Sequence, residues 1–125
     1  KLDMVIRSQY YRSIYPLSSD SQHWTSGYEI GLTNGFMITR SIIKERLDIF
    51  SSLTSGPVYS PKMPDRQAEG INFSNEISIG IGFHISDQVQ VEMFPSFRHL
   101  SNAMIKAPNR GINNTMLSIG ANVKL

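Results

Sequence analysis

Two residues that can perform nucleophilic chemistry, His99 and Ser101, lie at the end of a run in which apolar and polar residues alternate. A strand has a side-chain period of two, so both residues point to the same face of a sheet. That face also carries the apolar residues Val91, Met93 and Phe97. A base and a nucleophile fit poorly in the apolar core of a soluble protein. They fit well on a surface that contacts lipid, with a lipid as the substrate.

The composition excludes a bundle of membrane helices but not a membrane protein built from strands. The chain has 125 residues, which indicates one domain, and 40% of them are hydrophobic. No apolar run approaches the roughly 18 residues that a spanning helix needs. Transmembrane β-barrels have a low average hydropathy because lipid-facing and lumen-facing residues alternate. The mean hydropathy of −0.20 is therefore compatible with a barrel.

Charge and metal-ligand patterns exclude several other classes. The net charge is only +2 and no basic cluster is present, so no nucleic-acid partner is expected. Cysteine is absent, and the three histidines lie far apart without carboxylates at ligand spacing. Neither a metal site nor a cofactor is expected.

Alternation along the chain predicts six strands, with room for a seventh. The predicted strands cover residues 1–15, 24–40, 42–53, 71–86, 88–101 and 113–125, and the predicted loops cover residues 16–22, 55–69 and 102–110. Asn34-Gly35 is compatible with a hairpin turn, but the apolar parity continues through it and favours one strand. Residues 42–53 also match helical spacing, although the neighbouring segments favour a strand. Pro57, Pro61 and Pro64 indicate the second loop.

The segment from Ile71 to Ser86 defines the fold class. Its odd positions are mostly isoleucine and phenylalanine, and its even positions are small or polar. Sixteen residues are long for a globular strand, which usually has about 5–6, but typical of a tilted barrel strand. The sequence therefore predicts an all-β, antiparallel up-and-down transmembrane β-barrel. A soluble, lipocalin-like barrel with its core on the isoleucine face is the alternative.

The motif around the histidine resembles a known family. The matching residues are His99-x-Ser101-Asn102-Ala103, followed by Pro108-Asn109-x-Gly111-Ile112. They resemble the signature of the PagL-type lipid A deacylases, also called acyloxyacyl-hydrolase-like. Arg66-Gln67, in the loop before Gly70, adds a weaker match. The resemblance covers the C-terminal half well and the first fifty residues only by their strand pattern.

The resemblance implies a fold and a setting. It implies an eight-stranded barrel in the cell outer membrane, so the single domain of residues 1–125 is expected to lack about two N-terminal strands. It also implies lipid A, the anchor of lipopolysaccharide, as the substrate, and it leaves a homodimer open.

The resemblance also implies roles for individual residues. Ser101 corresponds to the nucleophile and His99 to the base of an esterase that removes an ester-linked acyl chain at the lipid-facing surface. Asn102 and Asn109 correspond to the oxyanion hole. The acidic residue that orients the histidine falls on Asn113, which is a departure from the family pattern.

The predicted hairpin supports this assignment without the resemblance. A register centred on Lys106 places His99 directly opposite Asn113, where Cβ atoms are about 4.5–5.5 Å apart. Asn113 also shares the parity of Leu117 and Ile119. A nucleophile, a base and an orienting group then meet on one apolar face. The alternative is a catalytically silent outer-membrane barrel with a structural or binding role, which the missing acid favours.

Overall fold

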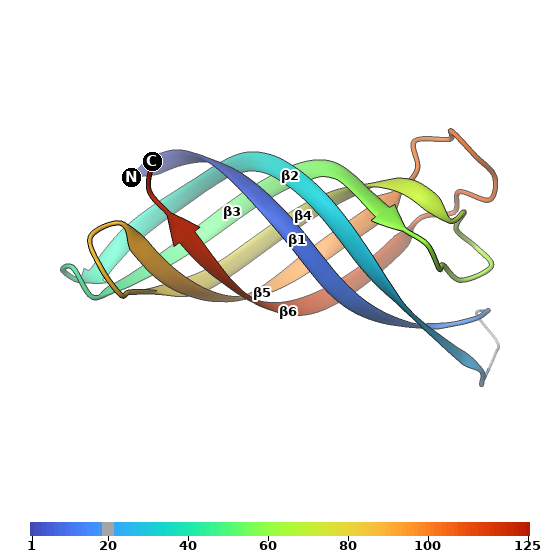
Figure 1. The fold of residues 1–125 in the computed structure, drawn as a ribbon, viewed down its shortest axis with the longest axis horizontal. Coiled ribbons are helices and arrows are strands. Elements are labelled where there is room, and N and C mark those ends of the chain that lie inside the picture. The colour runs from blue at the N-terminus through green and yellow to red at the C-terminus, as the bar shows by residue number, and fades with distance from the viewer. Residues whose placement is uncertain (19–21) are drawn as a thin grey trace.

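The computed structural model describes residues 1–18 and 22–125. Its strands are β1 (Leu2–Pro16), β2 (Trp24–Ile43), β3 (Leu47–Ser60), β4 (Gly70–His84), β5 (Val89–Ser101) and β6 (Ile112–Val123). Each strand pairs antiparallel with the next in one sheet, which curls into a half-barrel (Figure 1). The described residues contain no helix long and apolar enough to cross a membrane. The prediction of an all-β, antiparallel fold is confirmed.

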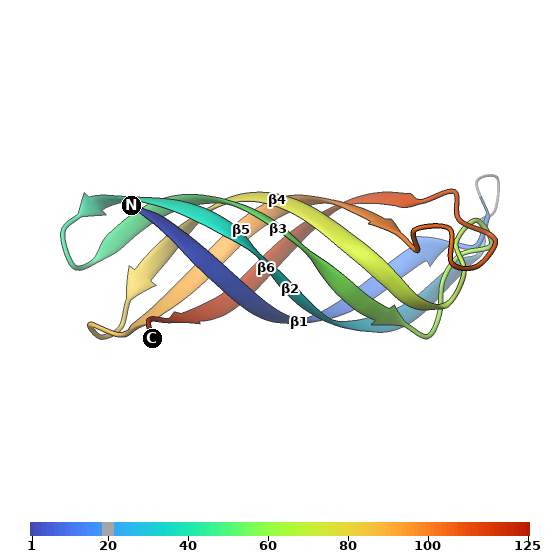
Figure 2. The ribbon, with the colours of Figure 1, turned by 90° about the horizontal axis from the view of Figure 1, so that it is seen from above.

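The two ends of the half-barrel differ. Both termini lie at one end, together with the short turns between β2 and β3 and between β4 and β5 (Figures 1 and 2). The longer β3–β4 and β5–β6 loops lie at the other end. The end of β5 and the start of β6, which carry the histidine motif, are therefore at the loop end.

Burial alternates along the strands and separates a mostly polar interior, which also holds two clusters of buried hydrophobic side chains, from an apolar exterior. On β5, Glu92, Ser96 and Arg98 are buried, whereas Met93 and Phe97 are exposed. The other strands alternate in the same way, and more than twenty large hydrophobic side chains of the described residues are exposed. This arrangement is the inverse of a soluble core and matches the outer surface of a membrane barrel.

A buried ion pair dominates the interior near the loop end. Arg98 of β5 donates to Glu29 of β2 at 2.6 Å (Nη1 to Oε2), and their side chains are 0% and 1% exposed. Arg98 also donates to the Tyr15 hydroxyl at 3.2 Å and lies over the Tyr11 ring, 5.0 Å from its centre. The ion pair and the two tyrosines thus join strands β1, β2 and β5 across the interior.

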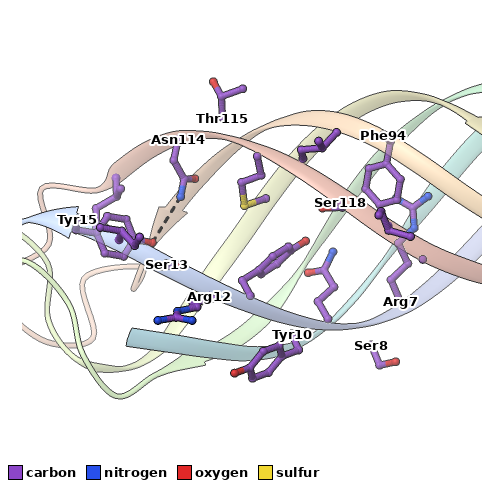
Figure 3. Close-up of a pocket in the computed structure, with 18 of the residues that line it drawn as sticks. Arg7, Ser8, Tyr10, Arg12, Ser13, Tyr15, Phe94, Asn114, Thr115 and Ser118 are labelled. Carbon is purple, nitrogen blue, oxygen red and sulfur yellow. Dashed lines mark hydrogen bonds between the residues drawn. The ribbon is translucent and has the colours of Figure 1, made fainter. Parts of the chain in front are cut away.

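The sheet is open between β1 and β6, its two edge strands. A cavity of about 760 Å³ lies between them and is lined by residues of both strands. A hydrogen bond crosses this gap from β6 to β1: the Asn114 side-chain amide donates to the Tyr15 hydroxyl at 3.5 Å (dashed in Figure 3). The eight strands implied by the resemblance stay a prediction.

One predicted loop is wrong in its first part. Residues 55–69 were expected to form a loop, but β3 continues through Gly56 and Pro57 to Ser60. Opposite these two residues, the paired register with β2 is interrupted between Gly31 and Asn34. Pro57 is tolerated there because it has no backbone hydrogen bond to β2 to lose. The neighbouring Gly56 is needed for a different reason, since a Cβ at this position would collide with the Leu32 carbonyl. Only residues 61–69 connect β3 to β4.

The two segments that the sequence left open, residues 34–35 and residues 42–53, both belong mainly to strands. β2 runs unbroken through Asn34-Gly35, as predicted, and a Cβ on Gly35 would collide with the Leu53 carbonyl. Residues 42–53 are largely strand, but a turn at residues 44–46, with Glu45 at a φ of 59°, divides them between β2 and β3. The predicted loop of residues 16–22 falls partly outside the described residues, and Pro16 belongs to β1.

The interior ion pair generates a stability prediction. Replacing Glu29 with alanine leaves the Arg98 guanidinium buried without its counter-charge, a change that costs about 3–5 kcal/mol. We expect Glu29→Ala to unfold in detergent at a clearly lower urea concentration than the parent, as followed by Trp24 fluorescence. Glu45→Ala, in the exposed β2–β3 turn, is the control and should match the parent. Equal midpoints for the two variants would contradict the assigned role of the pair.

Candidate active site

The β5–β6 register brings together two of the residues singled out in the sequence. His99 is the direct partner of Asn113, as predicted, and both side chains are exposed on the outer face. The His99 Nδ1 and Asn113 Oδ1 atoms are 2.7 Å apart. Because the amide oxygen is only an acceptor, Nδ1 carries the proton in this bond, and in the neutral ring Nε2 then keeps its lone pair. The arrangement holds the imidazole in the tautomer that can act as a base.

Ser101 lies two residues beyond His99, at the last position of β5. It is half-buried and shares the outward parity of His99. Among the hydrogen bonds of the described residues, none joins His99 to Ser101. Catalytic hydrogen bonds are often long in structures without substrate and tighten only in the reacting complex.

A glycine beside the histidine leaves space for the imidazole ring. Gly111 precedes β6 with a φ of +72°, in the left-handed region that favours glycine. A Cβ at this position would lie 2.8 Å from the His99 Cε1 atom. Any other residue would therefore displace the ring as well as strain the backbone.

The two asparagines of the β5–β6 loop differ in the donors that they leave free. Asn102 is buried; its backbone N–H donates to Asn109 Oδ1 at 2.9 Å and its side-chain amide donates to the Lys106 carbonyl at 2.5 Å. The Asn109 oxygen accepts two bonds, from Asn102 and from Gln67. The Asn109 oxygen is therefore held by two partners, whereas its amide N–H groups donate none of the hydrogen bonds among the described residues.

Gln67, in the β3–β4 loop, fastens the β5–β6 loop in place. Its side chain is 2% exposed, and its Oε1 accepts the Gly111 backbone N–H at 3.0 Å. Its Nε2 donates to Asn72 Oδ1 at 2.7 Å and to Asn109 Oδ1 at 3.2 Å. One side chain thus holds both Gly111, which leaves space for the His99 ring, and the amide oxygen of Asn109.

The sequence did not assign a role to Gln67. In the sequence, Arg66-Gln67 stands out only through the family resemblance, because a glutamine in a proline-containing loop carries no periodic signal. The contact depends on two loops that are more than thirty residues apart in the chain and become neighbours at one end of the sheet (Figure 1). The described residues include no group of three or more histidines, cysteines and carboxylates that could hold a metal ion.

Loss of the Gln67 side chain should loosen the β5–β6 loop. We expect Gln67→Leu to leave the part-buried Gly111 N–H without its acceptor, at a cost of up to about 1–3 kcal/mol, the range for a fully buried donor. Exchange of the Gly111 amide hydrogen should become roughly tenfold faster or more, as measured by hydrogen–deuterium exchange. Gln90→Leu is the matched control, since Gln90 is a buried, hydrogen-bonded glutamine at the opposite end of the sheet. Unchanged exchange in Gln67→Leu would show that the loop is held by other contacts.

Comparison with known proteins identifies the family. The family model described as lipid A 3-O-deacylase (PagL) matches residues 7–122, nearly the whole chain. Searches of curated proteins and of solved structures returned no match. The match includes the outward-facing His99 and Ser101 as well as all of the loop that follows them. The chain therefore belongs to the lipid A 3-O-deacylase family, whose reaction is the hydrolysis of an ester.

Proposed function

We propose that this protein removes an ester-linked acyl chain from lipid A by serine–histidine catalysis on the outer surface of its barrel. The observation that carries the proposal is the 2.7 Å bond between His99 Nδ1 and Asn113 Oδ1 on an exposed apolar face. This bond supports a base with its lone pair on Nε2, and Ser101 on the same face supports a nucleophile within reach.

The reaction proceeds in two halves. His99 Nε2 takes the proton of the Ser101 hydroxyl while the oxygen attacks the ester carbonyl, and the tetrahedral intermediate places a negative charge on the carbonyl oxygen. Amide N–H groups of Asn109, with Asn102 supporting the loop, stabilise this charge. The sugar oxygen leaves with the proton from His99, and the acyl group remains on Ser101. Water, deprotonated by His99, then releases the fatty acid and restores the serine.

The apolar exterior supports a membrane setting for this chemistry. PagL enzymes act in the outer membrane, and we infer that the exposed hydrophobic face of this chain contacts the lipid there. A shallow apolar hollow of about 340 Å³ lies on the outer face, and Ile77, Phe97 and Thr115 are among its lining residues. Phe97 is two residues before His99 and Thr115 two residues after Asn113, so an acyl chain held at the site can continue into the hollow. A homodimer stays a prediction.

The activity itself is tested by mass spectrometry of lipid A after incubation with the protein in detergent micelles. We expect the parent to release one ester-linked acyl chain and Ser101→Ala to release none, because the variant lacks the attacking oxygen. His99→Ala should lose nearly as much, since a serine without a base is a weak nucleophile at neutral pH.

The control for these variants is Ser8→Ala, which removes an outward hydroxyl from β1. It should retain parental activity, and heat-dependent gel mobility should show that all variants are folded. An unchanged lipid A spectrum with the folded parent would instead favour a catalytically silent barrel. Activity that survives in Ser101→Ala would assign the nucleophile elsewhere.

Asn113 generates a separate prediction about the orienting group. A neutral amide oxygen fixes the His99 tautomer, whereas a carboxylate would add a charge-assisted bond, typically about twice as strong, once the ring is protonated. We expect Asn113→Glu to keep or raise the initial rate of lipid A deacylation. Asn113→Leu, which is apolar and of similar size, should lose most of it. A parental rate for Asn113→Leu would exclude Asn113 as the orienting residue.

A further inference from the structure

A single row of polar side chains crosses the apolar outer face and ends at the candidate site. The paired positions are Asn34 on β2, Ser55 on β3, Asn75 on β4, His99 on β5 and Asn113 on β6, each opposite the next. All five side chains are exposed. We call these residues the outer polar row. It begins at the loop end of β6 and reaches the middle of β2.

Apolar residues border the row on both sides. Two residues away along the strands, Phe36, Leu53, Ile77 and Phe97 form a paired row of exposed hydrophobic side chains. On the other side lie Leu32, Pro57 and Phe73, before Ser101. A hydrogen-bonding group costs free energy in an apolar environment unless it has a partner. Polar residues that face the membrane are accordingly rare and tend to be functional.

The row is partly ordered from within and keeps donors for a ligand. The Ser55 hydroxyl donates to Asn75 Oδ1 at 2.8 Å, which fixes the amide so that its N–H groups are free to point elsewhere. Asn75 is also the direct partner of His99 across the β4–β5 pair. His99 therefore has an asparagine on each side, Asn113 as its own hydrogen-bond partner and Asn75 toward the rest of the row.

The length of the row indicates the size of its ligand. Neighbouring strands are about 4.8 Å apart, so the three steps from His99 to Asn34 cover about 14 Å. Recognition of a single ester would need only the groups next to His99 and Ser101. A row of this length suits a lipid in which several acyl chains leave one head group side by side, each with a carbonyl or hydroxyl near its root.

We propose that the outer polar row binds the carbonyl and hydroxyl groups at the roots of the acyl chains that neighbour the chain being cleaved. This inference rests on the proposed function and extends it, because it assigns Asn34, Ser55 and Asn75 to recognition of a multiply acylated glycolipid. The three side chains are neutral, so they suit carbonyl and hydroxyl groups better than phosphates, which favour charged donors.

The test measures binding without turnover. Fluorescent lipid A is titrated in detergent micelles against Ser101→Ala, alone and combined with Asn34→Leu or Asn75→Leu. Each row substitution removes neutral hydrogen bonds and is expected to weaken binding roughly two- to tenfold. Ser8→Leu in the same background is the matched control, because Ser8 is an outward polar residue of β1 outside the row. A lipid with one acyl chain is the comparison ligand and should bind all variants equally.

Two outcomes would overturn the proposal. If neither Asn34→Leu nor Asn75→Leu changes the affinity for lipid A, the row takes no part in recognition. If the one-chain lipid loses as much affinity as lipid A, the substitutions act on lipid binding in general and not on the neighbouring acyl chains. Asn34→Leu lies in the middle of β2, three strands from His99, so its result does not depend on local disturbance of the site. A failure of the proposed function would look different: the parent would still bind lipid A but would not cleave it.

Discussion

The register between β5 and β6 is the constraint on which the candidate site depends. Side chains alternate between the two faces, so a slip by one residue would send His99 into the interior. The structure fixes this register from both sides of the sheet. Outside, His99 is bonded to Asn113; inside, the next pair is Arg98 and Asn114, joined by a 3.1 Å bond from Arg98 Nε to Asn114 Oδ1.

The inner pair connects the site to the rest of the half-barrel. Arg98 is held by Glu29 and Tyr15, and Asn114 donates to the same tyrosine. The backbone that presents His99 and Asn113 outward is therefore anchored by charge and hydrogen bonds in the polar interior. The interior ion pair and the outer candidate site share the same two strands, which explains how an exposed pair of side chains can keep a defined geometry.

The loops at the site end are held in a different way from the strands. Gln67 joins the β3–β4 and β5–β6 loops by side-chain bonds, and backbone bonds from Ala68 to Pro108 and from Arg110 to Arg66 run beside it. These contacts place Asn109 and Gly111 relative to His99. The strands thus place His99, Ser101 and Asn113, which we propose as base, nucleophile and orienting amide, while the loop contacts position the residues beside them.

The sequence by itself determined which residues face outward and which two meet. Period-two alternation assigned His99, Ser101 and Asn113 to one face, and the length of the hairpin loop was enough to pair His99 with Asn113. The same local rules wrongly predicted a loop at Pro57, which lies inside β3. A proline fits there because the pairing with β2 is interrupted, and that interruption depends on a different strand.

Only the tertiary structure decided the contacts that link distant segments. The Arg98–Glu29 pair joins residues 69 positions apart, and Gln67 reaches Gly111 across 44 positions. The outer polar row needs four strand registers at once, and no single segment shows it. The alternation of apolar and polar residues can be read from each strand's own sequence. Which residue lies beside which across the sheet is set by the pairing of all six strands.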